Sequence, residues 1–482
     1  MAKISTASRF ARQGSGGPME FLDEPCSRQR RQTATMGIVC GRQPAVSETG
    51  KLIGVKMSQV STADRNAASD APPANAPTGK VGVYLALLQL FFTLGWTIYV
   101  IYLPQLAAKV GLPPGAVIVI LLVDQAIFTI TDTLMGIAAD RMTPIAGRLS
   151  RVVIWLTVVS CAAFLALPFV ADLGPNAKIA LIALTLTWVV TSSALRAPPL
   201  ALLGKFAAKP SIPILSCLTM LGYGIAGAVS PYLGVVLRNH DPRIPFVIST
   251  VVLLVTALTM SWIEQQLREG KLVAPERKPL TIPKSWSTLA LIFIAAVLVL
   301  ALGYQLHFSV NSAPLFLRFA KQPDLQWLMP VYWIGFNIAM FPASFITRRL
   351  GGLLVIGCAG LLGAGAVFGM ENATGLNTMI AMQFLAGAAW GCILMSAVAA
   401  AIAVSGGAEG KVLGLMFSAL AVATFARIAA VSGGLTRNSA YDALLQWTPI
   451  LCWALAGFAL LVIALSRLRK WRDSADPVSA PV

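Results

Sequence analysis

Twelve apolar stretches, each about as long as a membrane-spanning helix, follow one another between Val83 and Ser466. The hydrocarbon core of a bilayer is about 30 Å thick, and a helix needs roughly 20 residues to cross it. The pattern therefore predicts twelve transmembrane helices. Their expected ranges are 83–107, 113–139, 152–171, 177–198, 213–237, 244–264, 286–308, 325–347, 350–370, 374–404, 411–434 and 446–466.

Composition supports a membrane protein and explains the net charge of +17. Hydrophobic residues make up 56% of the 482 residues and charged residues 12%, whereas a soluble chain carries about 25% charge. The expected cytoplasmic loops and C-terminus hold 17 Lys and Arg, and the expected outer loops hold seven. This bias places both termini in the cytoplasm, and the charge indicates no nucleic-acid partner.

The chain divides into five predicted segments. Residues 1–80 are rich in Ser, Ala, Gly, Pro and Arg and lack sustained periodicity, which predicts a disordered cytoplasmic tail. The longest inner loop separates the spans six and six. The remaining predicted segments are a six-helix bundle (81–264), a cytoplasmic linker (265–285), a second six-helix bundle (286–466) and a C-terminal cytoplasmic tail (467–482).

A basic turn recurs at corresponding places in the two halves. Gly136-Ile-Ala-Ala-Asp140-Arg141 follows the second span, and Arg348-Arg349 follows the eighth. Such a recurrence is typical of transporters built from two parallel repeats.

The motif Gly136-x-x-x-Asp140-Arg141 resembles the loop signature of the major facilitator superfamily, although the usual following Gly-Arg pair is displaced to Gly147-Arg148. The resemblance covers residues 83–466. It implies an all-α membrane protein with 12 transmembrane helices in two six-helix halves, in which the second and eleventh spans meet across the halves.

A narrower resemblance rests on two segments. Thr131-Asp132-Thr-Leu-Met-Gly136 looks like a segment of the glycoside–pentoside–hexuronide cation symporters, and Arg196-Ala-Pro198 is similar to the end of span four in that group and in sucrose transporters. The group carries a second carboxylate one turn before Asp132, where this chain has Phe128, and its span-four Asp aligns with Arg196. Since a sodium site needs several hard oxygen ligands, the resemblance with these departures implies proton coupling or uniport rather than sodium coupling.

Five ionisable side chains lie within the spans away from their ends: Asp124, Asp132, Arg196, His307 and Arg427. A charge at the bilayer centre costs about 2.5–3.5 kcal/mol on insertion scales and normally has a partner. The rise of 1.5 Å per residue puts Asp132 and Arg196 roughly 12–13 Å from the cytoplasmic surface, and Asp124 and Arg427 roughly 24 Å from it.

These depths predict two acid–base pairs. Asp132 and Arg196 form either a coupling pair or a static packing pair, and Asp124 and Arg427 form either a link that opens when the halves separate or a structural link. A lone His307 is either a protonation site or a hydrogen-bonded packing residue.

The polar residues of the spans predict a gate and a cavity. The turn with Gly136, Asp140 and Arg141 is expected to act as a gating latch at the inner surface. Aromatic and amide side chains that suit a sugar or another neutral polar solute are expected to line a cavity. They are Gln89, Trp96, Tyr99, Tyr304, Gln305, Asn311, Asn337, Gln383 and Trp390.

We therefore expect a monomeric secondary transporter in the plasma (inner) membrane. It would move a small polar solute, such as a sugar or glycoside, by alternating access, as a symporter coupled to H⁺ or another cation. An efflux antiporter for drugs or metabolites, and a non-transporting receptor or assembly factor with the same fold, are the alternatives. No nucleotide-binding loop, metal-ligand cluster or nucleophile–base set occurs in the sequence, so neither an enzyme nor a cofactor or metal site is predicted.

Overall fold

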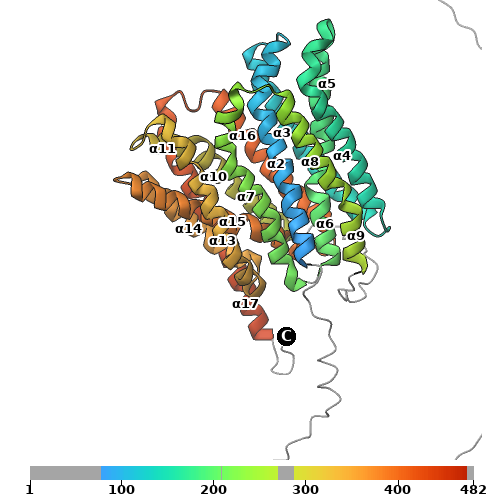
Figure 1. The fold of residues 1–482 in the computed structure, drawn as a ribbon. Helices are drawn as coiled ribbons and strands as arrows, with labels where there is room; N and C mark the ends of the chain where they lie inside the picture. Colours follow the sequence, from blue (N-terminus) through green and yellow to red (C-terminus); the bar gives the residue numbers. More distant parts are fainter. Residues whose placement is uncertain (1–77, 208, 270–286, 475–482) are drawn as a thin grey trace, which may run out of the picture. The chain divides into compact units, whose positions relative to one another are not determined.

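The computed structural model describes residues 78–207, 209–269 and 287–474. The predicted tail up to residue 77, most of the predicted linker (270–285) and the last residues from 475 lie outside the described residues. Every regular element in the described part of the chain is helical (Figure 1).

The first half begins with the long helices α2 and α3, and its fourth and sixth crossings are each made of two helices in succession. Its helices are α2 (Thr78–Lys109), α3 (Pro114–Met142), α4 (Arg148–Ala166), α5 (Ala177–Ser192), α6 (Ala197–Phe206), α7 (Ile212–Val236), α8 (Arg243–Leu258) and α9 (Met260–Glu269).

The second half contains a π-helical turn, His307–Asn311, between its first two helices. Its helices are α10 (Thr288–Leu306), α11 (Ser312–Leu317), α12 (Leu325–Leu328), α13 (Pro330–Leu350), α14 (Gly352–Glu371), α15 (Leu376–Val404), α16 (Glu409–Ser432) and α17 (Asp442–Ser474).

Among the described residues, eleven helical segments are long and apolar enough to cross a membrane. One of them, Arg148–Phe206, has 59 residues, which at 1.5 Å per residue is roughly three times the thickness of the hydrocarbon core. It is interrupted at Gly174, whose φ of 57° and ψ of −124° suit glycine, and Pro175 follows. Because α4 and α5 pack against each other on either side of this break, the segment is two crossings. The prediction of twelve crossings is confirmed.

The predicted fourth span, 177–198, is not one continuous helix. A short 3₁₀ turn, Ser193–Leu195, and Arg196 separate α5 from α6. Proline disfavours helical conformation in the residue before it and supplies no backbone N–H, so the Pro198-Pro199 pair is tolerated only in the first turn of a new helix. Arg196 therefore lies at a helix junction in the middle of the crossing.

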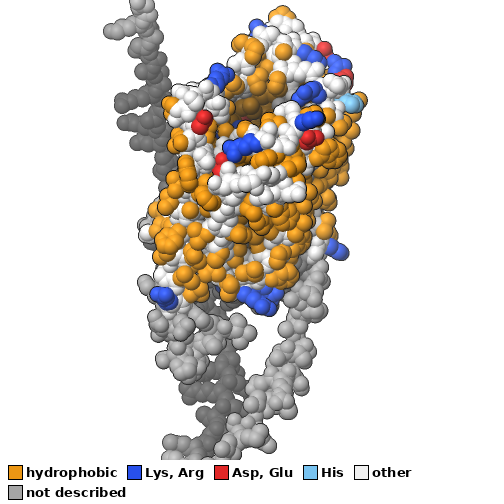
Figure 2. All heavy atoms as spheres, turned by 90° about the vertical axis from the view of Figure 1, so that its left-hand side faces the viewer, with side chains coloured by type: hydrophobic (Ala, Val, Ile, Leu, Met, Phe, Trp, Pro, Cys, Tyr) orange, Lys and Arg blue, Asp and Glu red, His pale blue; other side chains and the backbone are white. Residues whose placement is uncertain are grey.

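Hydrophobic side chains also cover the outside of the molecule. Figure 2 shows a broad band of them on one face, with Lys and Arg above and below it. Among the large hydrophobic side chains, Trp155, Ile179 and Phe345 are each more than 60% exposed. An apolar exterior of this kind is stable in lipid and unstable in water.

Contacts between the two halves are made chiefly by α3 with α16 and by α7 with α13. Glycines permit the close approach: a Cβ atom at Gly227 of α7 would clash with the ring of Trp333 of α13. Small residues at helix interfaces let backbones meet at short range, which is the main source of packing energy between helices in lipid.

Candidate functional site

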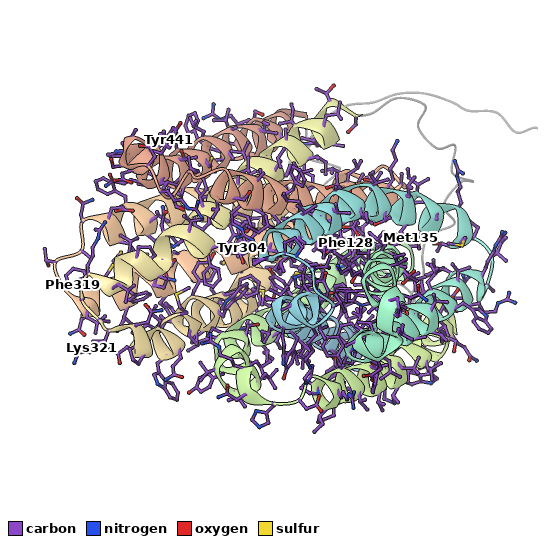
Figure 3. The ribbon with its side chains drawn as sticks, turned by 90° about the horizontal axis from the view of Figure 1, so that it is seen from above. Phe128, Met135, Tyr304, Phe319, Lys321 and Tyr441 are labelled. Carbon is purple, nitrogen blue, oxygen red and sulfur yellow. The ribbon has the colours of Figure 1, made fainter. Side chains whose placement is uncertain are left out.

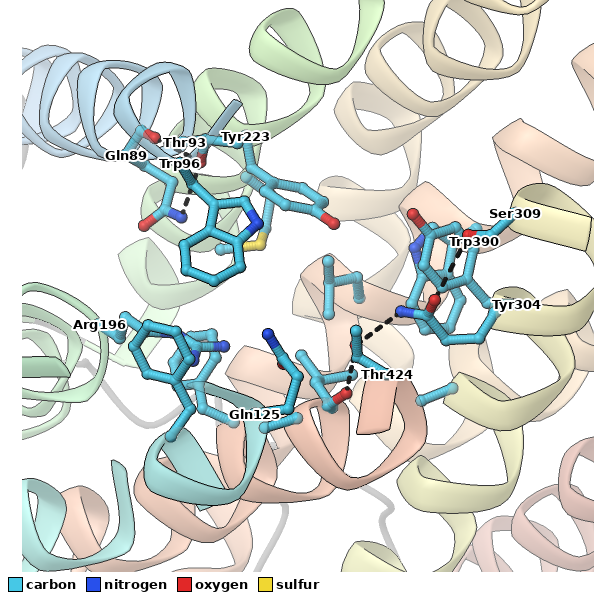
Figure 4. Close-up of a pocket in the computed structure, with 18 of the residues that line it drawn as sticks. Gln89, Thr93, Trp96, Gln125, Arg196, Tyr223, Tyr304, Ser309, Trp390 and Thr424 are labelled. Carbon is cyan, nitrogen blue, oxygen red and sulfur yellow. Dashed lines mark hydrogen bonds between the residues drawn. The ribbon is translucent and has the colours of Figure 1, made fainter. Parts of the chain in front are cut away.

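A cavity of about 300 Å³ lies between the halves, and both halves line it. Viewed from above, Phe128 and Tyr304 lie toward the centre of the helices and Lys321 and Tyr441 at the margin (Figure 3). In the close-up, Trp96 and Tyr223 of the first half lie across the cavity from Tyr304 and Trp390 of the second (Figure 4). The polar or aromatic lining residues are Gln89, Phe92, Thr93, Trp96, Gln125, Phe128, Arg196, Tyr223, Tyr304, Gln305, Ser309, Trp390, Phe417, Thr424 and Arg427.

The helix junction between α5 and α6 directs Arg196 toward this cavity. Its Nη1 lies 2.7 Å from Oδ2 of Asp132, which is fully buried on α3. The two oxygens of Asp132 accept no hydrogen bond of good geometry from the described residues, so the pair is held by charge and distance rather than by directed bonds. The structure brings together the first acid–base pair expected from depth.

Arg196 also links the halves through two aromatic rings. Its guanidinium lies 4.9 Å from the ring centre of Phe128 in α3 and 5.1 Å from that of Phe417 in α16. A cation over an aromatic face gains roughly 0.5–2 kcal/mol, more when it is shielded from water. Separation of α16 from α3 would remove one of these contacts.

Arg427 is held by a hydrogen-bond network inside the second half. Its Nε donates to Oε1 of Gln305 at 2.9 Å, and Nε2 of Gln305 donates to the hydroxyl of Thr424 at 2.8 Å. The hydroxyl of Ser309 lies 3.4 Å from Oε1 of the same Gln305. The network holds Gln305 at the cavity wall, which Arg427 also lines.

Asp124 and Arg427 are not paired in this structure. The carboxylate of Asp124 is fully buried and accepts a hydrogen bond from the hydroxyl of Tyr99 at 2.8 Å, within the first half. Arg427 bonds to Gln305 within the second half. Equal depth along two helices did not imply contact, because each side chain bonds to a partner in its own half. Formation of this pair in another access state remains a prediction.

The end of α3 that carries Gly136 and Asp140 and the first turns of α16 form a close seam. A Cβ atom at Gly136 would clash with the carbonyl of Gly410, and one at Gly414 would clash with the carbonyl of Asp132. Above these glycines the hydroxyls of Thr133 and Ser418 lie 2.7 Å apart. Ser418 is also within 2.6 Å of the carbonyl of Thr129 and donates to it.

Asp140 lies at the end of the seam, at the N-terminus of α16. Its carboxylate accepts hydrogen bonds from the backbone N–H groups of Gly410 and Lys411, at 2.9 and 2.8 Å, in the first turn of α16. Acidic groups stabilise helix N-termini, where N–H groups lack internal partners. Lys205 of α6 lies 3.3 Å from Asp140 and 3.9 Å from Glu409. Of the three residues expected to form a latch, Gly136 and Asp140 lie at the seam, whereas Arg141 is exposed. A gating role for them remains a prediction.

Four residues expected in the cavity lie elsewhere. Tyr99 is buried against Asp124, and Asn311 donates to the carbonyl of Leu445. Asn337 donates to the carbonyl one turn earlier in α13. Gln383 is fully buried and donates to Ser312.

His307 also lies away from the cavity. It is fully buried at the start of the π-helical turn, and neither of its ring nitrogens has a hydrogen-bond partner among the described residues. Its nearest ring neighbours are Tyr332, at 6.2 Å, and Trp453, at 6.4 Å, between centroids. A role for His307 in proton binding remains a prediction.

Several lining residues escaped the sequence reasoning. Gln125 and Thr424 carry polar groups inside apolar spans, which is a signal that sequence alone offers. Tyr223 and Phe417 carry no such signal, since aromatic residues are common throughout the spans. Their place at the cavity depends on how each helix is rotated about its axis.

The predicted pairing of Asp124 with Arg427 in another access state can be tested by mutation. If they pair when the outer ends of α3 and α16 approach, Asp124→Asn and Arg427→Gln will each slow transport, and the double variant will recover part of the loss. A buried charge left alone costs about 3–5 kcal/mol, and removing both partners costs much less. A double-mutant cycle on transport rate at equal abundance is the measurement. Additive losses would contradict the pairing.

No protein-family model matches the chain, and no curated protein matches it in sequence. Solved structures match its fold. A bacterial homologue of the iron transporter ferroportin in an outward-facing state is 14% identical, with a TM-score of 0.61 over 80% of this chain and 100% of that one.

Two further solved structures are similar. The human organic anion transporter MFSD10 is 13% identical, with a TM-score of 0.57 over 82% of this chain and 100% of that one. The proton:xylose symporter XylE, of the major facilitator superfamily, is 11% identical, with a TM-score of 0.54 over 82% of this chain and 95% of that one. The likenesses establish the major facilitator fold and lend no support to the narrower resemblance to glycoside symporters.

Proposed function

We propose that the chain is a secondary transporter that carries a small polar solute across the membrane by alternating access. The observation that carries the proposal is the cavity lined by both halves, beside which α3 and α16 pack closely in a seam. The topology expected from the Lys and Arg bias puts this seam on the cytoplasmic side, where it would close the cavity. Glycine contacts, short hydroxyl bonds and a capping carboxylate hold that seam. Such contacts can separate and re-form without exposing a large apolar surface, as a gate requires.

The pair Asp132–Arg196 is the proposed coupling element. It lies beside the cavity, and its arginine contacts Phe417 across the interface, so movement of α16 changes the surroundings of Asp132. Protonation of Asp132 would release Arg196, and this links proton binding to the separation of the halves. A receptor or assembly factor would need neither a breakable seam nor a charge pair beside a cavity.

A disulfide across the seam tests alternating access. In a variant without the seven native cysteines, Thr133→Cys with Ser418→Cys should cross-link, since the native hydroxyls are 2.7 Å apart. Gln125→Cys in the cavity should react with an impermeant maleimide from either face of the membrane. Cross-linking should abolish labelling from the cytoplasmic face alone, and reduction should restore it.

The matched control joins Thr97 and Ser230, whose hydroxyls are 3.0 Å apart within the first half. A disulfide between cysteines at these positions should leave labelling from both faces unchanged. Absence of cytoplasmic labelling in the reduced protein would contradict alternating access and favour a static receptor or assembly factor.

A further inference from the structure

The charges that line the cavity do not balance. Arg196 and Arg427 both line it, and no Asp or Glu is among its lining residues in the described part of the chain. Arg196 has a counter-charge, because Asp132 lies 2.7 Å from it, buried behind the cavity wall. Arg427 forms no ion pair with any described residue, and its hydrogen-bond partner, Gln305, is neutral. The cavity therefore carries one surplus positive charge, at Arg427.

Arg427 also has unused hydrogen-bond donors, which a negatively charged ligand could occupy. A guanidinium has five N–H donors arranged as a planar fork, and the bond from Nε to Gln305 uses one of them. Asp124, the acid at similar depth on α3, is fully buried and bonded to Tyr99. A partly buried cation without a counter-ion is costly, and a bidentate carboxylate is the geometric match for the remaining donors.

We propose that the cavity binds a small organic anion whose carboxylate pairs with Arg427. The proposal rests on the function proposed above and replaces the neutral sugar expected from the sequence. Trp96 of one half and Tyr304 and Trp390 of the other supply the aromatic surface for the apolar or hydroxylated body of the molecule. Tyr304 and Trp390 stack with their ring centres 4.5 Å apart and their planes at 4°.

The size and polarity of the cavity restrict the anion further. A volume of about 300 Å³ is at the lower end for ligand sites, so the anion has the size of a single ring or a monosaccharide acid. Gln89 and Gln125 offer neutral amides to hydroxyl groups on the side of the first half. A neutral sugar could use the amides, but it would leave the charge of Arg427 without a counter-ion in a site of low dielectric.

Matched pairs of probes test the charge requirement on the unaltered full chain. Isothermal titration calorimetry in detergent would compare glucuronate with glucose and benzoate with benzyl alcohol, so that the members of each pair differ mainly by the carboxylate. We expect the anion of at least one pair to bind about 10- to 100-fold tighter than its neutral partner, as for hydrogen bonds to a charged group. Equal or tighter binding of the neutral partner in both pairs would overturn the proposal.

Variants assign the effect to Arg427. Arg427→Gln should remove the preference for the anion, and Arg427→Lys, which keeps the charge but loses the fork, should retain part of it. Arg437→Gln, at an exposed arginine of the loop that follows α16, is the matched control and should bind as the unaltered protein does. Retention of the full preference in Arg427→Gln would place the anion elsewhere and overturn the proposal.

The binding measurement is independent of transport. Anion binding that depends on Arg427, without labelling of Gln125→Cys from the cytoplasmic face, would support the anion site and reject alternating access. Labelling from both faces, with glucose and benzyl alcohol each bound at least as tightly as its acid, would support the transporter and reject the anion site.

Discussion

Asp132→Asn is expected to abolish uphill transport while leaving downhill exchange. The carboxylate of Asp132 is the one acidic group that the described structure places against Arg196, and it is completely buried. Asn resembles the protonated carboxyl in shape but cannot exchange a proton, so the variant should bind and exchange the solute without drawing on the proton gradient. Coupling between two bound species is typically worth about 1–3 kcal/mol, so the accumulation ratio should fall about five-fold or more.

The measurement is uptake into proteoliposomes with and without an imposed pH gradient. Uptake by the unaltered protein should rise as the pH on the solute side falls, because protonation of Asp132 is the proposed coupling step, and the Asn variant should show no such rise. Besides Asp132 itself, the charged groups on α3, α6 and α16 and at the α5–α6 junction are Asp124, Asp140, Arg141, Arg196, Lys205, Glu409, Lys411 and Arg427. Asp172→Asn, in an exposed pair with Arg243, is the matched control and should keep the pH dependence. An unchanged accumulation ratio in Asp132→Asn would eliminate the role of Asp132.

Gly136→Leu is expected to prevent closure of the cytoplasmic seam and to stop transport. Even a Cβ atom at this position would clash with the backbone of Gly410, which cannot move aside as a flexible side chain could. Overpacking costs about 1–3 kcal/mol, and each 1.4 kcal/mol shifts an equilibrium ten-fold. The protein should still fold, because the clash arises only in the state in which α3 meets α16.

The matched control for this glycine lies in the same helix. A Cβ atom at Gly115 of α3 would meet no other atom within 4 Å, so Gly115→Leu should transport at the rate of the unaltered protein. In Gly136→Leu the cavity reporter Gln125→Cys should be labelled faster from the cytoplasmic face. Normal transport in Gly136→Leu would show that closure of the seam is not part of the cycle.

The sequence determined the number of crossings, because each span depends on the composition of about 20 successive residues. It also located the charged residues within the spans, because a charged residue in an apolar span is conspicuous without knowledge of its neighbours. The pairing of Asp132 with Arg196 could be predicted from their similar depth together with their place in the same half. Gly136 and Asp140, which lie at the seam between α3 and α16, could be singled out because the motif that contains them is a local one.

The tertiary structure decided which groups meet within and across the halves. Asp124 and Arg427 have similar depths, yet one bonds to Tyr99 and the other to Gln305. The lining of the cavity by Tyr223 and Phe417, and the surplus charge at Arg427, likewise emerge only from the assembled helices. The periodicity of an apolar span establishes that a helix crosses the membrane. It does not establish how the helix is rotated, because lipid-facing and protein-facing positions are equally apolar, so the partners of a buried charge depend on packing between distant segments.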